Sequence, residues 1–130
     1  MHDRENKRMI IDHIGFAISD CEKSNDFYSK ALAPLGIEKV MEYDGWFGYG
    51  REGKPELWFG EALEVHSPMH IAFAADSREQ VRQFYDAAIQ AGGKDNGKPG
   101  IREEYHPDYY GAFVIDPDGH NIEAVCHRPE

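Results

Sequence analysis

The sequence predicts an α+β fold built from two tandem copies of one module, each a strand, a helix and three further strands (βαβββ). Three observations lead to this fold class. The chain repeats itself, apolar residues recur at helical spacing once in each repeat, and turn signals separate short apolar runs after each helix. At 130 residues the chain has the length of one ordinary domain. We therefore predict a single domain with module one at 9–60, a linker at 61–69 and module two at 70–126.

The internal repeat needs no gap over its first half. Residues 13–36 align with 70–93 at a constant offset of 57, and nine of the 24 pairs are identical. Further along, inserting one residue pairs Glu56 with Glu123. Each copy then opens with a histidine and closes with a glutamate. The identical pairs are His13/His70, Ile14/Ile71, Phe16/Phe73, Ala17/Ala74, Glu22/Glu79, Phe27/Phe84, Tyr28/Tyr85, Ala31/Ala88 and Gly36/Gly93.

Module one begins with a strand predicted over Met9 to Ile18, which is rich in β-branched residues. Asp20 can cap the helix that follows, whose apolar residues recur at helical spacing until Gly36 ends it. Asp44-Gly45 and Gly53-Lys54-Pro55 are turn signals between the remaining strands. These strands are predicted around 39–43, 46–50 and 56–59.

Module two follows the same order. Ser77 and Gln80 form a capping-box pattern at the start of its helix, and Gly92-Gly93 ends that helix. The turn at 116–119, Asp-Pro-Asp-Gly, predicts the last hairpin. The strands after the helix are predicted at 101–105, 111–115 and 121–125.

Strand alternation places four polar side chains on one face. Residues i and i+2 of a strand share a face, so the apolar residues that alternate with His13 and His70 should pack on the helices while each histidine faces away. The same alternation turns Glu56 and Glu123 to the helix-free side. Two imidazoles and two carboxylates on one concave face have the composition of a divalent metal site, with Ni, Zn, Co, Mn or Fe as suitable ions.

Composition excludes several other functions. The formal net charge of −10 disfavours nucleic acid and anionic lipid as partners. No apolar run reaches the 18 or so residues of a membrane span, and the opening MHDRENKRMI has no apolar core of secretory length. Two cysteines do not make a disulfide scaffold. We expect a cytoplasmic protein whose partner is a small molecule, with no nucleic acid and no membrane.

From residue 9 to 126 the chain resembles the vicinal oxygen chelate superfamily, which includes glyoxalase I, extradiol dioxygenases, fosfomycin thiol transferases and bleomycin-binding proteins. The resemblance rests on DHIGFAISD with His13, MHIAFAADS with His70 and FVIDPDGHNIEAV with Glu123, and less strongly on ELWFG with Glu56. It implies a curved, half-open sheet around one divalent metal ion held by these four residues.

The resemblance also implies an activity. We expect a metal-dependent, glyoxalase-like lyase or isomerase, with Glu56 and Glu123 as catalytic carboxylates acting on a substrate with vicinal oxygens. A homodimer is compatible with such modules, which pair either within one chain or between two. Glutathione is not the expected substrate, because Ala17 and Gly60 stand where glyoxalase I has the Arg and Asn that hold it. The alternatives are an extradiol-type dioxygenase, a thiol transferase, or a metal-free antibiotic-binding protein.

Four further residues are candidates for substrate contacts. His106, Tyr109 and Tyr110 lie in the segment that leads into a predicted strand, and Trp58 lies two residues after Glu56. Trp58 is expected to line the pocket as an apolar wall.

Overall fold

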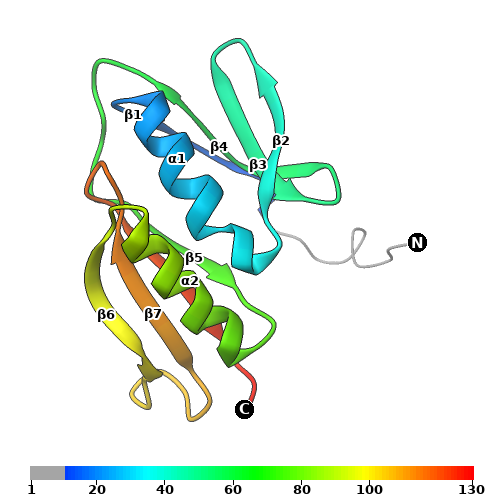
Figure 1. Ribbon diagram of the computed structural model, residues 1–130, viewed down its shortest axis with the longest axis vertical. Helices are drawn as coiled ribbons and strands as arrows, with labels where there is room; N and C mark the ends of the chain where they lie inside the picture. The colour runs from blue at the N-terminus through cyan, green and yellow to red at the C-terminus, as the bar shows by residue number, and fades with distance from the viewer. Residues whose placement is uncertain (1–10) are drawn as a thin grey trace.

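The computed structural model describes residues 11–130, which form two four-stranded sheets and two α-helices (Figure 1). The strand orders are β1-β4-β3-β2 and β5-β8-β7-β6, and in each sheet the first pair is parallel while the others are antiparallel. The predicted α+β fold of two tandem βαβββ modules is confirmed. The elements are β1 (Ile14–Ile18), α1 (Cys21–Ala31), the short 3₁₀ helix η2 (Ala33–Leu35), β2 (Glu38–Tyr43), β3 (Trp46–Arg51), β4 (Lys54–Glu61), β5 (His70–Ala74), α2 (Arg78–Gln90), β6 (Lys94–Ile101), β7 (Tyr110–Ile115) and β8 (Asn121–Cys126).

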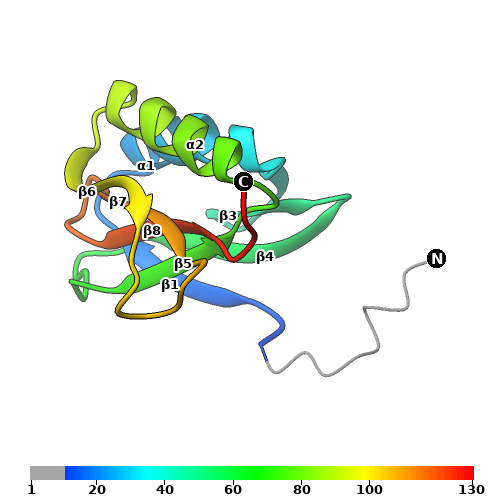
Figure 2. The same ribbon diagram turned by 90° about the horizontal axis from the view of Figure 1, so that it is seen from below.

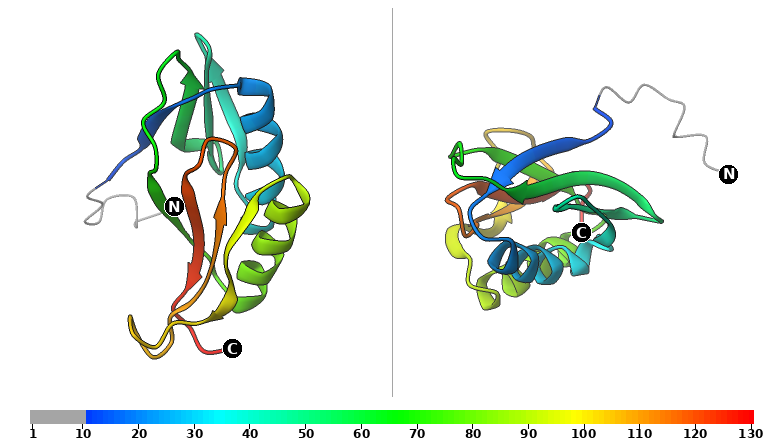
Figure 3. Two further views of the ribbon diagram at one scale, coloured as in Figure 1. Left: turned by 90° about the vertical axis from the view of Figure 1, so that its left-hand side faces the viewer. Right: turned by 90° about the horizontal axis from the view of Figure 1, so that it is seen from above.

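Both α-helices lie on the same side of the two sheets. Figure 2 and the right panel of Figure 3 show α1 and α2 next to each other above the strands, and the two helices are in contact. Within the part of the chain that the structure describes, the opposite side of the sheets carries no helix. Neither helix, within residues 11–130, is long and apolar enough to span a membrane.

Both helices begin where the sequence predicts, but α1 ends at Ala31, and the 3₁₀ helix η2 separates it from Gly36, where the sequence placed the end of the helix. Asp20 caps α1 by accepting a hydrogen bond from the Lys23 backbone N–H at 3.1 Å, and Ser77 caps α2 in the same way through the Gln80 N–H. After η2, Gly36 takes a left-handed conformation with φ of 76°, which a glycine adopts at little cost.

The predicted alternation of strand faces is also confirmed. Phe16 and Ile18 of β1 are buried, as are Leu57 and Phe59 of β4, and all four belong to one core cluster beneath the helices. Glu56, directly before Leu57 on the same strand, is exposed. The helix-free face therefore carries the polar residues that the sequence assigned to it.

Two predicted strands need correction. The strand predicted from Met9 to Ile18 begins at Ile14, so that His13 precedes β1; residues 9 and 10 lie outside the described part. The strand predicted at 101–105 is wrong, because the chain there forms a loop and the actual strand is β6, Lys94–Ile101. Its sequence, KDNGKPGI, is polar and rich in glycine, a composition that does not predict a strand. Its pairing with β7 is interrupted by bulges.

The β7–β8 turn joins the two modules. Asp116, only 5% exposed, accepts a hydrogen bond from the Tyr28 hydroxyl of α1 as well as from the backbone N–H groups of Asp118 and His120 in its own turn. The His120 ring packs edge-on against Phe16 of β1, with ring centroids 5.5 Å apart. This turn therefore fixes β8 relative to the first module.

We predict that Tyr28→Phe lowers the free energy of unfolding by about 1–3 kcal/mol, because the buried Asp116 carboxylate loses a hydrogen-bond donor. Urea unfolding followed by circular dichroism would measure it. Tyr85→Phe is the matched control, since its hydroxyl donates to the solvent-exposed Asp95 and its loss should cost less than about 0.5 kcal/mol. Equal effects of the two substitutions would contradict the importance of the buried contact.

Candidate active site

His70 and Glu123 meet on the helix-free face of the second sheet. β5 and β8 are parallel neighbours, and Ala72 is the register partner of Glu123. The His70 Nε2 atom lies 2.9 Å from Glu123 Oε1. The histidine side chain is 53% exposed, whereas that of Glu123 is only 1% exposed. A nearly buried carboxylate therefore points towards an imidazole that solvent and ligands can reach.

Tyr109 binds the other oxygen of the same carboxylate. Its hydroxyl donates a hydrogen bond to Glu123 Oε2. Burial, together with the Glu123 carboxylate, raises the pKa of Tyr109 well above its ordinary value. Gly111 makes the approach possible, because a Cβ there would lie 3.2 Å from Glu123 Oε2 and 3.3 Å from the Tyr109 ring. Tyr109 is thus a neutral donor at neutral pH.

The loop that carries Tyr109 is held by contacts at both ends. The Arg102 backbone N–H donates to the Tyr109 carbonyl, and the Tyr109 N–H donates to the His106 carbonyl. His127, just after β8, packs edge-on against Tyr109 with ring centroids 5.2 Å apart. Arg78 of α2 pairs with Asp108 at 3.6 Å. These contacts position the hydroxyl over Glu123.

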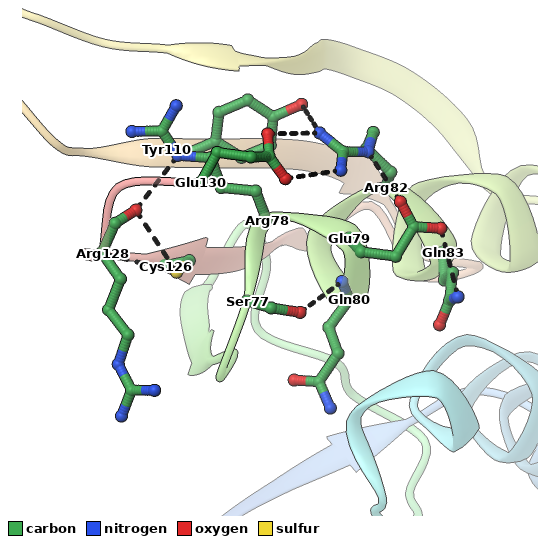
Figure 4. Close-up of polar contacts among 10 residues, drawn as sticks. All are labelled: Ser77, Arg78, Glu79, Gln80, Arg82, Gln83, Tyr110, Cys126, Arg128 and Glu130. Atoms are coloured by element: carbon green, nitrogen blue, oxygen red, sulfur yellow. Dashed lines mark hydrogen bonds and ion pairs between the residues drawn. The ribbon is translucent and has the colours of Figure 1, made fainter.

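Next to this loop, the C-terminal segment is tied to α2 (Figure 4). Arg82 pairs with Glu130 at 2.9 Å and also donates to the Tyr110 hydroxyl, and these bonds raise the pKa of Arg82 above its ordinary value. Arg78 lies over the Tyr110 ring. The Arg78 side chain also donates to the Arg128 carbonyl. Tyr110 is therefore engaged with arginines of α2.

Of the three predicted substrate contacts in this segment, Tyr109 alone contacts Glu123. His106 is exposed, and its Nδ1 accepts a hydrogen bond from the Asp108 N–H. Tyr110 packs among the arginines described above. The sequence patterns did not identify Gly111. The only feature of the sequence that pointed to it is that it comes directly before Ala112, a residue of β7 that packs inward.

His13 and Glu56 lie in module one and line a common pocket of about 290 Å³. The His13 Nδ1 atom lies 2.8 Å from the carboxylate of Asp12, a partner that the sequence analysis did not consider. Ile71 and Phe73 of β5 also line this pocket, so both modules contribute to it. His70 and Glu123 are not among its lining residues.

The strand registers correct the alignment of the two glutamates. Leu57 pairs with Ile14 in the first sheet, and Ile122 pairs with Ile71 in the second. Since Ile14 and Ile71 are equivalent in the repeat, the position of Glu123 corresponds to Trp58. Glu56 corresponds instead to Asn121. It shares the helix-free face with Trp58 but lies two residues earlier on β4, about 7 Å away along the strand.

The structure thus brings the four predicted ligands together in pairs. His70 is next to Glu123, and His13 shares a pocket with Glu56. Within residues 11–130 of one chain, no three His, Cys, Asp or Glu side chains form a group that could hold a metal ion. Each half contributes one imidazole and one carboxylate.

Comparison with known proteins agrees with the fold. The model of the Glyoxalase/Bleomycin resistance protein/Dioxygenase superfamily matches residues 10–124. No curated protein matches significantly. A crystal structure of a glyoxalase/bleomycin resistance protein from Albidiferax ferrireducens T118 is 27% identical, with a TM-score of 0.80, and the match covers 91% of this chain and 99% of that one.

Two more distant structures share the fold alone. A glyoxalase/bleomycin resistance protein/dioxygenase family enzyme from Burkholderia phytofirmans PsJN is 18% identical, with a TM-score of 0.71 and coverage of 90% of this chain and 98% of that one. The oxidase ChaP-H2 is 23% identical, with a TM-score of 0.66 and coverage of 93% and 94%.

We predict that Tyr109→Phe destabilises the protein by about 1–3 kcal/mol, because the buried Glu123 carboxylate loses a donor. Hydrogen exchange should speed up at the Arg102 and Tyr109 amides, which close the loop. Tyr105→Phe is the control, since Tyr105 is 62% exposed in the same loop. If Tyr109→Phe changed neither stability nor exchange, the hydroxyl would not hold the loop.

Proposed function

The chain belongs to the glyoxalase/bleomycin resistance protein/dioxygenase superfamily, and we propose that it is a metal-dependent enzyme of this family. In this proposal it acts on a small substrate with two adjacent oxygens and moves a proton on it, as lyases and isomerases do. One observation carries the proposal: Glu123 is buried, yet its two oxygens face His70 and Tyr109. A buried carboxylate held in this way is suited to bind a cation and to accept a proton.

The residues of module two fit a divalent ion. Imidazole nitrogen and carboxylate oxygen are suitable donors for nickel, zinc, cobalt, manganese and iron. The donor atoms of His70 and Glu123 are 2.9 Å apart, and two ligands at right angles on bonds of about 2.1 Å would lie about 3 Å apart. When bound, such an ion would polarise a substrate oxygen as a Lewis acid.

The chain's own residues would carry the proton chemistry. Glu123 would take a proton from the substrate carbon beside a carbonyl and return it to the product. Tyr109 would keep the carboxylate oriented, because its raised pKa keeps the phenol protonated and able to donate. Ala72 and Ala74 follow His70 on the same face of β5, and their small side chains would leave room for the substrate.

We propose that two copies of the chain complete the site. Within residues 11–130 of one chain, His13 does not join His70 and Glu123 in a metal-holding group. A homodimer in which module one of one copy faces module two of the other would supply His13, with Glu56 as a fourth ligand and second proton acceptor. Two equivalent sites per dimer would result, as an isologous interface requires.

Glutathione does not fit as the substrate. If Glu56 is the ligand of module one, Gly60 stands where glyoxalase I has an asparagine, and a Cβ at Gly60 would lie 2.8 Å from the Trp46 ring. A side chain at this position would therefore displace the indole. This supports a substrate held by other groups.

The first test concerns the metal site and its assembly. Wild-type protein, dialysed against zinc and then washed, should hold about one ion per chain by elemental analysis, while His13→Ala and His70→Ala should each hold almost none. If the site lies between copies, an equal mixture of the two variants can be unfolded and refolded to give mixed dimers. One of the two sites in each mixed dimer then has both histidines. Since half of the dimers are mixed, roughly a quarter of the wild-type metal should return.

The mixture distinguishes the two arrangements. A site within one chain would give no recovery, because each chain carries one defect. If the His70→Ala variant by itself still held one ion per chain, the proposed ligand set would be wrong.

A second candidate function is oxygen-dependent chemistry, and the strand registers favour it. Because Trp58 stands at the position equivalent to Glu123, the ligands could be His13, His70 and Glu123 alone. Two histidines and one carboxylate leave positions for both substrate and dioxygen on iron. Proton transfer favours the set of four ligands that includes Glu56, because four protein ligands leave room on the ion for the substrate but not for dioxygen as well.

The ligand count separates the two candidates. Four ligands predict that Glu56→Gln weakens zinc affinity at least about tenfold, because a carboxylate ligand is lost. Glu42→Gln, an exposed glutamate on β2, should leave affinity unchanged. If Glu56→Gln binds zinc like the wild type while Glu123→Gln does not, three ligands remain, and dioxygen uptake by the iron-loaded protein becomes the expected activity.

A further inference from the structure

We propose that the helix-free face of module one is a stacking platform for a planar aromatic ring of the substrate. The platform consists of Trp46 and Trp58. This inference rests on the proposed function in one respect, namely that the oxygens of the same substrate are bound where His13 and the His70–Glu123 pair meet. It adds the chemical class of the substrate: an aromatic compound with two adjacent oxygens.

Each tryptophan lies across from a glycine in the sheet. Trp46 of β3 is the register partner of Gly60 of β4, and Trp58 of β4 is the partner of Gly48 of β3. Phe47, Tyr49 and their neighbours on the other face pack against Phe59 in the core. Two aromatic rings therefore occupy one face, each opposite the residue with no side chain.

The glycines let both indoles lie close against the backbone. A Cβ at Gly60 would meet Trp46 ring atoms at 2.8 and 2.9 Å, and a Cβ at Gly48 would meet Trp58 ring atoms at 3.0 Å. On β1, a Cβ at Gly15 would lie 3.8 Å from the Trp46 ring and 3.8 Å from the Trp58 Cβ atom. The missing side chains at these glycines therefore leave the space that the two indole rings occupy on this face of the sheet.

The rings are not buried by the protein's own core. Trp46 is 41% exposed, and Tyr43 beside it is 73% exposed. Together with Trp58 and Pro55 they line one shallow pocket. Exposed aromatic rings gathered in a depression mark a binding surface more often than ordinary packing.

Polar groups stand at the edge of this pocket and favour a small polar-edged ligand. His13 and Asp12 line it, as does Lys54, whose ammonium group is 3.7 Å from Asp12. A planar ring seated on the indoles would therefore have its edge near the His13 imidazole. The platform is continuous with the proposed ligand His13, and this continuity identifies the occupant as substrate.

The second module carries different residues at the positions of the platform. The position of Trp58 corresponds to Glu123, and the position of Trp46 corresponds to Gly111. Because Gly111 has no side chain, Tyr109 and Glu123 can approach each other beside it, as described above. The same backbone thus carries a polar His–Glu–Tyr group in one module and an apolar aromatic group in the other, which divides substrate binding between them.

Both tryptophans of the chain lie in the platform, so their signals report on it directly. The experiment titrates catechol, and separately cyclohexane-1,2-diol, into the ¹⁵N-labelled full chain in EDTA, and follows the two indole N–H resonances. The diol has the same vicinal oxygens but no aromatic ring. Catechol should shift both resonances and bind at least about tenfold more tightly than the diol, because stacking on an indole requires a ligand with an aromatic ring.

Variants test whether the stacked indoles cause the binding. Trp58→Leu should weaken catechol binding about tenfold, and Gly60→Val should do the same while keeping both indoles, because the new side chain displaces the Trp46 ring. Trp58→Phe should retain most of the affinity. Tyr85→Leu, which removes an aromatic ring on α2, away from this pocket, is the control and should bind as the wild type does.

The outcomes separate this inference from the proposed enzyme. Equal binding of catechol and the diol, or unchanged catechol binding in both Trp58→Leu and Gly60→Val, would overturn the platform while leaving the metal stoichiometry test untouched. Sedimentation of the same variants covers the alternative occupant. If they dissociate the dimer without altering catechol binding, a second copy covers this face and the platform is not a substrate site.

Discussion

The buried carboxylate of Asp116 is the contact on which the relation of the two modules depends. It lies in the turn before β8 and accepts hydrogen bonds from Tyr28 of the first module and from its own turn. A buried carboxylate is costly unless it is fully hydrogen-bonded, so the turn has few alternative arrangements. Glu123 follows in the next strand, three residues after His120, which packs on Phe16. The position of the candidate active site is thereby fixed relative to β1.

The duplicated backbone carries two different faces. On the helix side both modules bury equivalent residues, such as Phe27 and Phe84, because one continuous core constrains their size. The helix-free side has no such constraint, and there the two copies have diverged. One presents indoles on glycine, and the other presents the His70–Glu123 pair with Tyr109. A site assembled from both faces would combine apolar and polar binding groups that neither copy holds alone.

A loop supplies Tyr109, the third member of the polar group that contains His70 and Glu123. Tyr109 reaches Glu123 from the segment after β6, and the loop is supported by His127 and by Arg78 of α2. Loops carry binding residues when a rigid scaffold positions them. Here the scaffold is the end of β8 together with the first turns of α2, so the C-terminal segment also contributes to the geometry around the carboxylate.

The sequence by itself determined the two-module fold, both helix caps and the faces of β1, β4 and β5, because repeats, capping side chains and strand alternation are local patterns. It also named His70, Glu123 and Tyr109 as candidates, and the structure brings these three side chains into contact. It failed at β6, where polar and glycine residues form an edge strand that only pairing with β7 stabilises.

Only the tertiary structure decided which residues are neighbours across strands. The sequence alignment paired Glu56 with Glu123, but the register of hydrogen bonds pairs the Glu123 position with Trp58. The physical reason is that a shift of two residues leaves every side chain on its predicted face, so alternation cannot detect it. Register depends on contacts between segments more than forty residues apart, and no local pattern contains that information.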